Sequence, residues 1–361
     1  MKEIKLPSSD QFDEIIRQMQ ISNGEKGLTD YTNSPGPKTM LAGDRKNGFY
    51  GFVQPRDFGV IKGNPEDKQD MNASNLALSI GLAQGAAQFE DTPWMKFSVN
   101  GEIIFVPVKP IRHTVSWNGI YNQGAVYGDN TIGVNPPNGR AGDTVSVANN
   151  AFLITVAEDH WLRSGASIAS VGDTIVTRGF ANTENNGEFV VESITDTEIQ
   201  TNKTLVDEPA KLSHSVYNKK DAVTQNREVT IGDNKFKVQL LKGAGSDPLD
   251  GFASADRGMV GEKSQWNNLI LPLHEKAKLQ DWAYKAYAGT TENWAVGLTD
   301  LDLITHHTLG RGSYSWCQET GDSLPARRVL RGNHSASYGI VYDSWYAYSY
   351  YGWRPALRLL S

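Results

Sequence analysis

Aromatic residues with a spacing suited to ligand binding gather near the end of the chain. Between Tyr338 and Tyr351 the sequence holds six Tyr and one Trp, interleaved with Ser, Gly and Asp. Tyr and Trp offer large, stiff contact areas, and Ser and Gly add adaptable ones. Alternate positions are expected to pack into the core, but the aromatic residues outnumber the positions of one inward face, so several should be exposed. The predicted contact set is Tyr342, Trp345, Tyr346, Tyr348 and Tyr350.

Carboxylates near this stretch are the candidates for a hydrolytic site. Hydrolysis of a glycan needs two carboxyl groups about 5 or about 9 Å apart, and Glu319, Asp322 and Asp343 are close enough in sequence to be considered. Acidic residues beside loops are more often simply solvated. The chain also has no GxSxG, phosphate-binding Gly-Lys or HExxH motif. We therefore expect no catalytic residue and no enzymatic activity.

The residues that could bind a metal ion have unsuitable spacing. Asp247, Asp250, Asp256 and Glu262 form an acidic loop that does not match the EF-hand pattern, so we expect a solvated loop. His306-His307 are adjacent, and neighbouring residues of a strand point to opposite faces. No metal ion and no cofactor are predicted.

Two strands should hold the aromatic stretch in place. Residues 328–332 precede it, and residues 352–360 follow it and alternate like a final strand, with Trp353 and Arg354 as scaffold. Several Arg residues recur in and beside these strands, and we expect them to bind loop carbonyls and to pack on Trp353 by cation–π contacts. These are Arg327, Arg328, Arg331, Arg354 and Arg358.

The motifs of this region carry a family resemblance. RVLRG, an aromatic segment and then GWRPALRL resemble the C-type-lectin-type fold of the formylglycine-generating-enzyme branch, which includes phage tropism determinants. WCQET, RRVLRG and YGWRPALRLL resemble bacteriophage virion structural proteins. The resemblance implies an α+β fold, with a C-type-lectin-like domain of short helices and antiparallel sheet, and a virion setting.

The resemblance does not carry the chemistry of those families. Formylglycine-generating enzymes use paired cysteines, whereas Cys317 is the single cysteine of this chain. A calcium-dependent lectin site needs a WND-type strand and an EPN-type loop. Here Trp266 is followed by Asn267 and Asn268, and no EPN triplet exists. We expect neither activity.

Helical and hairpin signals organise the rest of the chain. Residues 1–22 predict a short amphipathic helix, with Phe12, Ile15, Ile16 and Met19 on one face, which we expect to anchor or oligomerise the protein. Residues 71–89 also have helical spacing. Asn100-Gly101, between two apolar runs, predicts a type I′ hairpin turn.

A small β domain is predicted as an insertion. From residue 138 to residue 221 the sequence changes to short β-rich runs separated by turns, typical of a small sandwich or barrel such as an Ig-like module. Residues 23–137 and 222–361 would form one discontinuous body, because inserted domains are accepted where the host ends lie close together. The alternative is three domains in series.

Composition limits the partners. The net charge is −6 and Lys and Arg are not clustered, which argues against nucleic-acid binding. No apolar run approaches the length of a membrane span, so membrane insertion is not expected. The first residues lack the apolar centre of a signal peptide, so Sec export is not expected. A protein made in the bacterial cytoplasm and localised in a virion fits these facts, and so does an ordinary cytosolic protein.

Three functional hypotheses remain open from the sequence. The first is a non-enzymatic virion structural protein, in the tail, neck or head, either as a decoration protein or as part of a fibre. Its partners would be other virion proteins and its own copies in a homo-oligomer, with a trimer as one alternative. The second is a dedicated receptor-binding protein for host attachment, recognising a host-surface glycan or protein. The third, the least favoured, is a particle-borne enzyme that degrades glycans.

Overall fold

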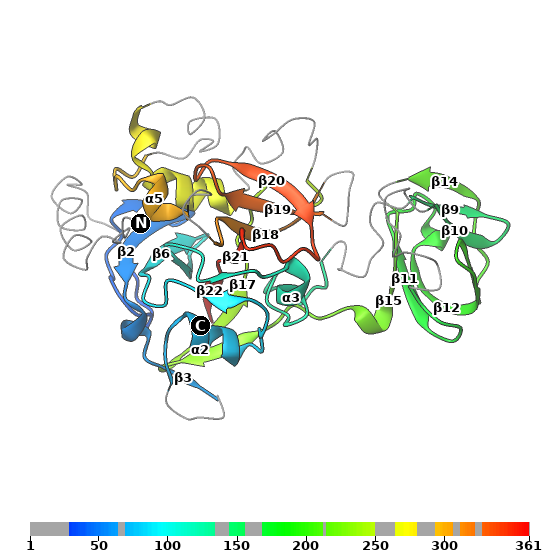
Figure 1. Ribbon diagram of the computed structural model, residues 1–361, viewed down its shortest axis with the longest axis horizontal. Coiled ribbons are helices and arrows are strands. Elements are labelled where there is room, and N and C mark those ends of the chain that lie inside the picture. The colour runs from blue at the N-terminus through cyan, green and yellow to red at the C-terminus, as the bar shows by residue number, and fades with distance from the viewer. Residues whose placement is uncertain are drawn as a thin grey trace.

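In the residues that it describes, the computed structural model is built from three β-sheets. It describes residues 29–63, 69–133, 144–155, 168–211, 214–249, 264–279, 293–305, 311–321 and 327–360. The sheets contain nine, seven and six strands, and one of them curls into a half-barrel (Figure 1). The nine-stranded and six-stranded sheets form the larger body, and the seven-stranded sheet lies to one side of it.

The nine-stranded sheet is antiparallel throughout and places the last strand of the chain in its middle. Each neighbouring pair carries antiparallel register, including the β6–β7 hairpin. The order is β1 (Ala42–Gly43), β2 (Asn47–Val53), β6 (Trp94–Val99), β7 (Glu102–Pro107), β22 (Ala356–Leu360), β17 (Asn234–Gln239), β16 (Glu228–Ile231), β3 (Val60–Lys62) and β4 (Gln69–Asp70).

Both faces of this sheet are buried. Ala356 of β22 belongs to one hydrophobic cluster and Leu357 to another on the opposite face. Ile104 and Phe105 of β7 divide in the same way. Strands covered on both faces read as nearly continuous apolar runs, which explains the sequence IIFV in β7.

The six-stranded sheet carries the aromatic stretch. β18 and β21 are parallel, whereas the other pairs are antiparallel. The order is β20 (Gly339–Asp343), β19 (Arg327–Gly332), β18 (Tyr314–Thr320), β21 (Tyr351–Trp353), β8 (Arg112–His113) and β5 (Ala86–Ala87).

The predicted closing strand, residues 352–360, is two strands in two different sheets. β21 ends at Trp353, and β22 begins at Ala356 in the nine-stranded sheet. Pro355 has no backbone N–H to donate, so a ladder cannot run through it unbroken. Arg354 and Pro355 therefore take the chain from one sheet to the other.

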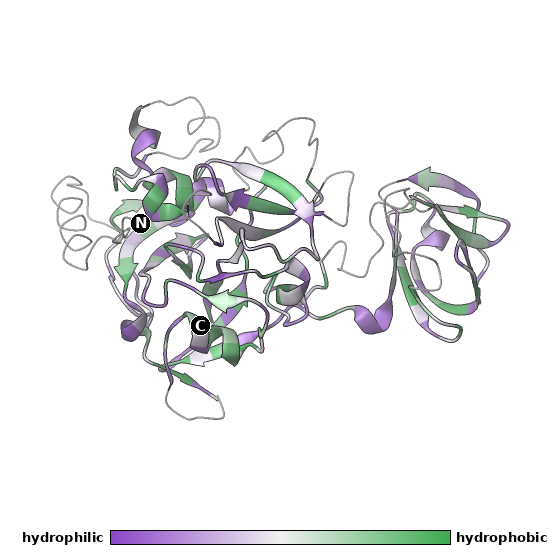
Figure 2. Ribbon diagram, in the orientation of Figure 1, coloured by the Kyte–Doolittle hydropathy of each residue, from purple (hydrophilic) through white to green (hydrophobic). Residues whose placement is uncertain are grey.

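The seven-stranded sheet has its own core. All the described residues of its hydrophobic cluster lie between Val145 and Val216. Buried residues alternate with more exposed ones along several of its strands, which carry both hydrophobic and hydrophilic residues (Figure 2). That residues 138–221 form an independent, inserted domain stays a prediction. The strand order is β14 (Glu208–Lys211), β9 (Thr144–Ala148), β10 (Ala151–Thr155), β13 (Glu198–Thr201), β12 (Gly187–Ile194), β11 (Thr174–Arg178) and β15 (Ser215–Asn218).

The α+β, C-type-lectin-like fold expected from the motifs is wrong, because the described chain is mostly β and its helices are short. The expected helix at residues 71–89 is reduced to seven residues. Gly81 adopts a φ of 80°, the left-handed conformation that ends helices, and Ala86–Ala87 then pair as β5. The α-helices are α2 (Ala73–Ser79), α3 (Trp117–Tyr121) and α5 (Asp300–Leu303), and shorter or irregular helical turns are η1 (Pro55–Phe58), η3 (Thr183–Asn185), η4 (Lys219–Asp221), η6 (Trp266–Ile270), η7 (Leu271–Leu273) and η8 (Glu275–Leu279).

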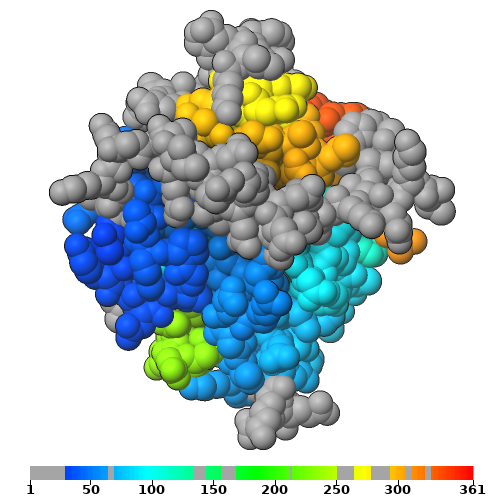
Figure 3. All heavy atoms as spheres, turned by 90° about the vertical axis from the view of Figure 1, so that its left-hand side faces the viewer, coloured from blue at the N-terminus to red at the C-terminus, as the bar shows by residue number. Residues whose placement is uncertain are grey.

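Long-range pairing joins distant parts of the chain. Figure 3 shows the turn between β16 and β17 (green) beside residues from the first part of the chain (blue). There Gly232 donates its N–H to the carbonyl of Val60 at 2.9 Å.

The predicted hairpin turn is confirmed, since Asn100 and Gly101 both have positive φ, 51° and 87°. The predicted helix at residues 1–22 lies outside the described residues.

Candidate functional site

Exposed aromatic side chains lie together at the end of β20 and in the segment that joins it to β21. Tyr342 is 36% exposed, Trp345 46%, Tyr348 51% and Tyr350 50%, whereas Tyr346 is partly buried against the core. We call these five residues the aromatic platform. Four of the five side chains in the predicted contact set are therefore exposed, whereas Tyr346 contributes to packing. Their role in binding stays a prediction.

Ring contacts connect most of the platform. The ring centroids of Trp345 and Tyr346 are 3.9 Å apart, and those of Tyr346 and Tyr348 are 4.9 Å apart. Tyr342 lies 5.5 Å from Tyr346. The rings of Tyr342 and Tyr348 both contact Tyr351, at 5.3 and 5.7 Å. Apart from the closer pair of Trp345 and Tyr346, these separations are typical of favourable aromatic pairs. Four of the five platform rings are therefore joined by direct contacts or through Tyr351.

A buried base supports the platform. Tyr351 is 4% exposed and packs on Trp316 of β18 at 5.1 Å between ring centroids. The backbone is held as well, since Tyr314 donates its N–H to the carbonyl of Tyr350 at 2.8 Å. The N–H of Tyr351 also bonds the carbonyl of Tyr348 at 2.9 Å. A surface fixed before binding loses less conformational entropy when a partner arrives.

Three phenols of this region, those of Tyr314, Tyr346 and Tyr351, stay neutral at physiological pH because burial raises their pKa. Burial raises the pKa of Tyr314 to about 12, with further contributions from neighbouring phenols. The pKa values of Tyr346 and Tyr351 are also raised, chiefly by burial. Neutral phenols donate and accept hydrogen bonds. The platform therefore offers apolar rings with polar edges.

The expected scaffold residues, Trp353 and Arg354, are both buried. The arginines were expected to pack on Trp353, and this choice of cation–π partner is wrong. Arg354 lies 5.1 Å from the ring centroid of Trp266, and Arg328 lies 4.1 Å from that of Trp117. Arg354 also donates to the carbonyls of Val108 and Leu303. The aromatic partners thus come from η6 and α3, far away in sequence, which spacing within the motif does not show.

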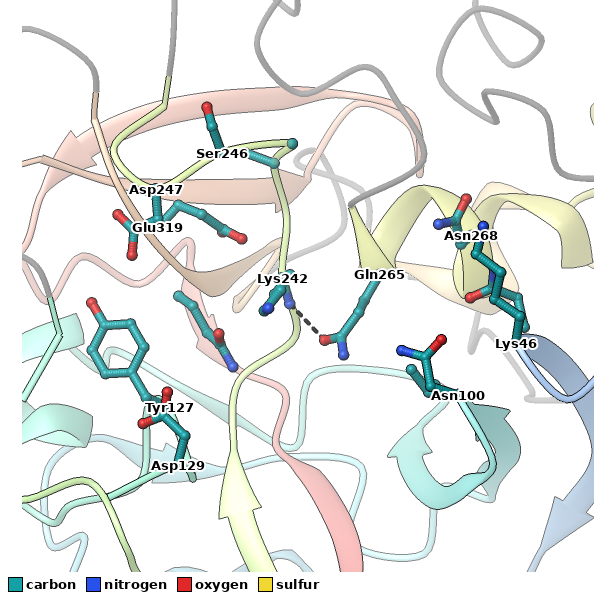
Figure 4. A pocket seen from close by; sticks show the side chains of 15 residues that line it. Lys46, Asn100, Tyr127, Asp129, Lys242, Ser246, Asp247, Gln265, Asn268 and Glu319 are labelled. Carbon is teal, nitrogen blue, oxygen red and sulfur yellow. Dashed lines mark hydrogen bonds between the residues drawn. The ribbon is translucent and has the colours of Figure 1, made fainter. Parts of the chain in front are cut away.

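A second group of residues, mostly polar or charged, surrounds a cavity of about 480 Å³ (Figure 4). The sequence patterns did not indicate that these residues come together. We call this cavity the carboxyl pocket. Asp247 is partly buried and accepts the N–H of Thr320 at 2.9 Å, so the prediction of a solvated loop is wrong at this residue. Glu319 is 2% exposed and accepts the N–H of Gly243 at 2.9 Å. These segments lie far apart in sequence, and no motif links them.

The other candidates have other surroundings. Asp343 forms an ion pair with Arg327 at 3.2 Å and does not line the carboxyl pocket. Cys317 is buried, and burial raises the pKa of its thiol well above the usual value. Within the described residues, no group of three or more His, Cys, Asp or Glu is placed to hold a metal ion. Asp250, Asp256, Glu262, His306, His307 and Asp322 lie outside the described residues.

Comparisons with protein families, with curated proteins and with solved structures find no match to this chain. None of the helices in the described ranges combines the length and the apolar character needed to cross a bilayer.

Proposed function

We propose that the protein is a non-enzymatic structural protein of a bacteriophage virion, which uses the aromatic platform to contact the host surface. The observation that supports this proposal is the exposure of four neighbouring aromatic residues on a buried base. Exposed apolar patches mark interaction sites. The virion setting rests on the motif resemblance of WCQET, RRVLRG and YGWRPALRLL.

A dedicated receptor-binding protein is the second candidate, because the same exposed aromatics suit recognition of a glycan. Stiff aromatic rings pack against the apolar faces of sugar rings, and their polar edges bind hydroxyl groups. The glycan-degrading alternative has no such support. Asp343 is paired with Arg327, and Glu319 lies in the carboxyl pocket.

Attachment of the purified full chain to intact bacterial cells and to an array of bacterial surface polysaccharides tests the proposal. Truncating an aromatic hot spot typically costs about 2 kcal/mol or more, so Tyr348→Ala should weaken attachment by at least about tenfold. Its melting temperature should stay close to that of the wild type, because surface substitutions change stability by about 0.5 kcal/mol or less.

A matched control is Tyr31→Ala. Tyr31 is 87% exposed and is not part of the platform, so its loss removes a similar exposed ring elsewhere. Attachment should be unchanged in this variant. Equal attachment by wild type, Tyr348→Ala and Tyr31→Ala would overturn the proposal. Attachment to purified virion proteins in place of cells would assign the platform to contacts within the particle.

A further inference from the structure

The carboxyl pocket is lined by hydrogen-bonding side chains from several separate segments. Its volume of about 480 Å³ lies within the range of ligand pockets, about 300 to 1,000 Å³. Amide, carboxyl, hydroxyl and ammonium groups all contribute to its wall. Its lining includes the side chains of Lys46, Tyr127, Lys242, Asp247, Gln265 and Glu319.

Tyr127 provides the observation that points to a ligand. Its side chain is buried, with 7% of the residue exposed, and it lines the pocket. Figure 4 shows the ring pointing toward Asp247 and Glu319. The hydroxyl oxygen has no hydrogen-bond partner among the residues that the structure describes. A buried hydroxyl without a partner is unfavourable, so a ligand that bonds it would be stabilised.

The two carboxyl groups add both donor and acceptor capacity. Burial, together with the nearby Asp247, raises the pKa of Glu319 to about 8, although backbone N–H groups that donate to the carboxyl group oppose the rise. Burial also raises the pKa of Asp247. At neutral pH Glu319 therefore keeps a proton to donate while its other oxygen accepts.

The charges around the pocket oppose ionic ligands. Lys46 and Lys242 line the wall and repel a cation, while Asp129 and Asp247 disfavour an anion. A divalent cation would also lack ligands, since the described residues contain no group of three or more His, Cys, Asp or Glu suited to a metal. A neutral ligand rich in hydroxyl groups matches both the charge balance and the mixture of donors and acceptors.

We propose that the carboxyl pocket binds a neutral polyhydroxyl ligand of monosaccharide or disaccharide size, with Tyr127, Asp247 and Glu319 bonding its hydroxyl groups. This proposal does not depend on the function of the aromatic platform. The full chain is tested by NMR, with millimolar glucose, galactose, N-acetylglucosamine or maltose as probes. At least one sugar should shift the amide signals of Gly243 and Glu319.

The decisive variant is Tyr127→Phe, which removes only the unpartnered hydroxyl. Sugar affinity should fall about tenfold, the loss expected for one good hydrogen bond. The melting temperature should be unchanged or higher, because no hydrogen bond within the described protein is broken. A merely structural role for this hydroxyl predicts the reverse pattern, with a lower melting temperature and unchanged affinity.

Tyr121→Phe is the matched control. The Tyr121 hydroxyl donates to the carbonyl of Ile132 at 3.1 Å and accepts from the N–H of Val223 at 3.2 Å. Its removal should lower the melting temperature and leave sugar affinity unchanged. Tyr348→Ala should also bind sugar at this pocket normally, which separates failure of this proposal from failure of the platform.

Three results would overturn the pocket proposal. The first is that no sugar of the panel shifts the amide signals of Gly243 and Glu319. The second is that Tyr127→Phe binds sugar as tightly as the wild type. The third is that calcium chloride or putrescine shifts these signals while no sugar does, which would identify a cation site.

Discussion

Glu319 and Glu208 are both buried, yet their carboxyl groups have opposite properties. Desolvation raises the pKa of each one. At Glu208 it is outweighed by hydrogen bonds from the backbone N–H groups of Ala181 and Asn182 and from amide side chains, so the pKa falls to about 2. At Glu319 burial and Asp247 win, and the pKa rises to about 8. The balance between desolvation, the neighbouring charge and the hydrogen-bond donors around each carboxyl group decides the outcome.

The raised pKa of Glu319 predicts a pH-dependent stability. The unfolded chain ionises this group near its ordinary pKa of 4.5, whereas the folded chain holds the proton until about pH 8. The free energy of unfolding therefore falls as the pH rises between these values. Glu319→Gln removes this effect, and should stabilise the protein by about 1 kcal/mol or more at pH 8.

Urea denaturation of wild type and Glu319→Gln at acidic and at mildly alkaline pH measures this difference. The gain in stability should be small near pH 4.5 and should grow toward pH 8. A difference in stability that is the same at both pH values would show that Glu319 ionises normally in the folded protein.

Local signals predicted some elements well and others poorly. The Asn100-Gly101 turn requires two positive φ values, and these residue types supply them at low cost. β14 was missed because it contains Pro209 and charged residues, which strand patterns disfavour but an edge strand tolerates. The crossing from β21 to β22 was missed because alternation continues through Arg354. Sequence patterns report the local period and not the sheet to which a strand belongs.

The candidate sites show the same limit. The aromatic platform is continuous in sequence, so composition alone indicated an exposed surface around Trp345 and Tyr348. The carboxyl pocket joins Tyr127, Asp247 and Glu319 from three distant segments. Only the tertiary fold brings them together, and each residue alone resembles an ordinary core or loop residue.

Substitution of Trp353 tests whether β21 supports the platform without binding a partner itself. Trp353 is fully buried in β21, next to the crossing into β22. Trp353→Ala should destabilise the protein by about 3 to 5 kcal/mol, the cost of deleting a large core ring. Differential scanning calorimetry should therefore show a clearly lower melting temperature. A variant that melts as the wild type would mean that β21 is not part of the core that holds the platform.

At the scale of the whole molecule, the seven-stranded sheet should be removable. Its cluster lies between Val145 and Val216, and the β6–β7 and β16–β17 hairpins on either side of it in the chain belong to one sheet. Replacing residues 138–221 by a short Gly/Ser linker should leave a body that unfolds cooperatively, since a domain with its own core contributes little to its host.

Calorimetry and amide NMR of the shortened chain check this prediction. The body signals of β6, β7 and β22 should keep their positions, apart from residues beside the linker. One such neighbour is Gly133, whose carbonyl accepts a bond from Arg178 at 2.7 Å. Loss of a cooperative transition in the shortened chain would make residues 138–221 part of the body and not an insertion.

The proposal that the aromatic platform is a binding surface on a stable base predicts that attachment and stability respond separately to substitution. It is tested most directly by measuring attachment to bacterial cells and the melting temperature on the same preparations of wild type and of the triple variant Trp345→Ala/Tyr348→Ala/Tyr350→Ala. We predict that attachment is lost with only a small change in stability, because a single surface substitution typically changes it by about 0.5 kcal/mol or less. A triple variant that melts much earlier and attaches normally would contradict the proposal, because these rings would then stabilise the core and the binding surface would lie elsewhere.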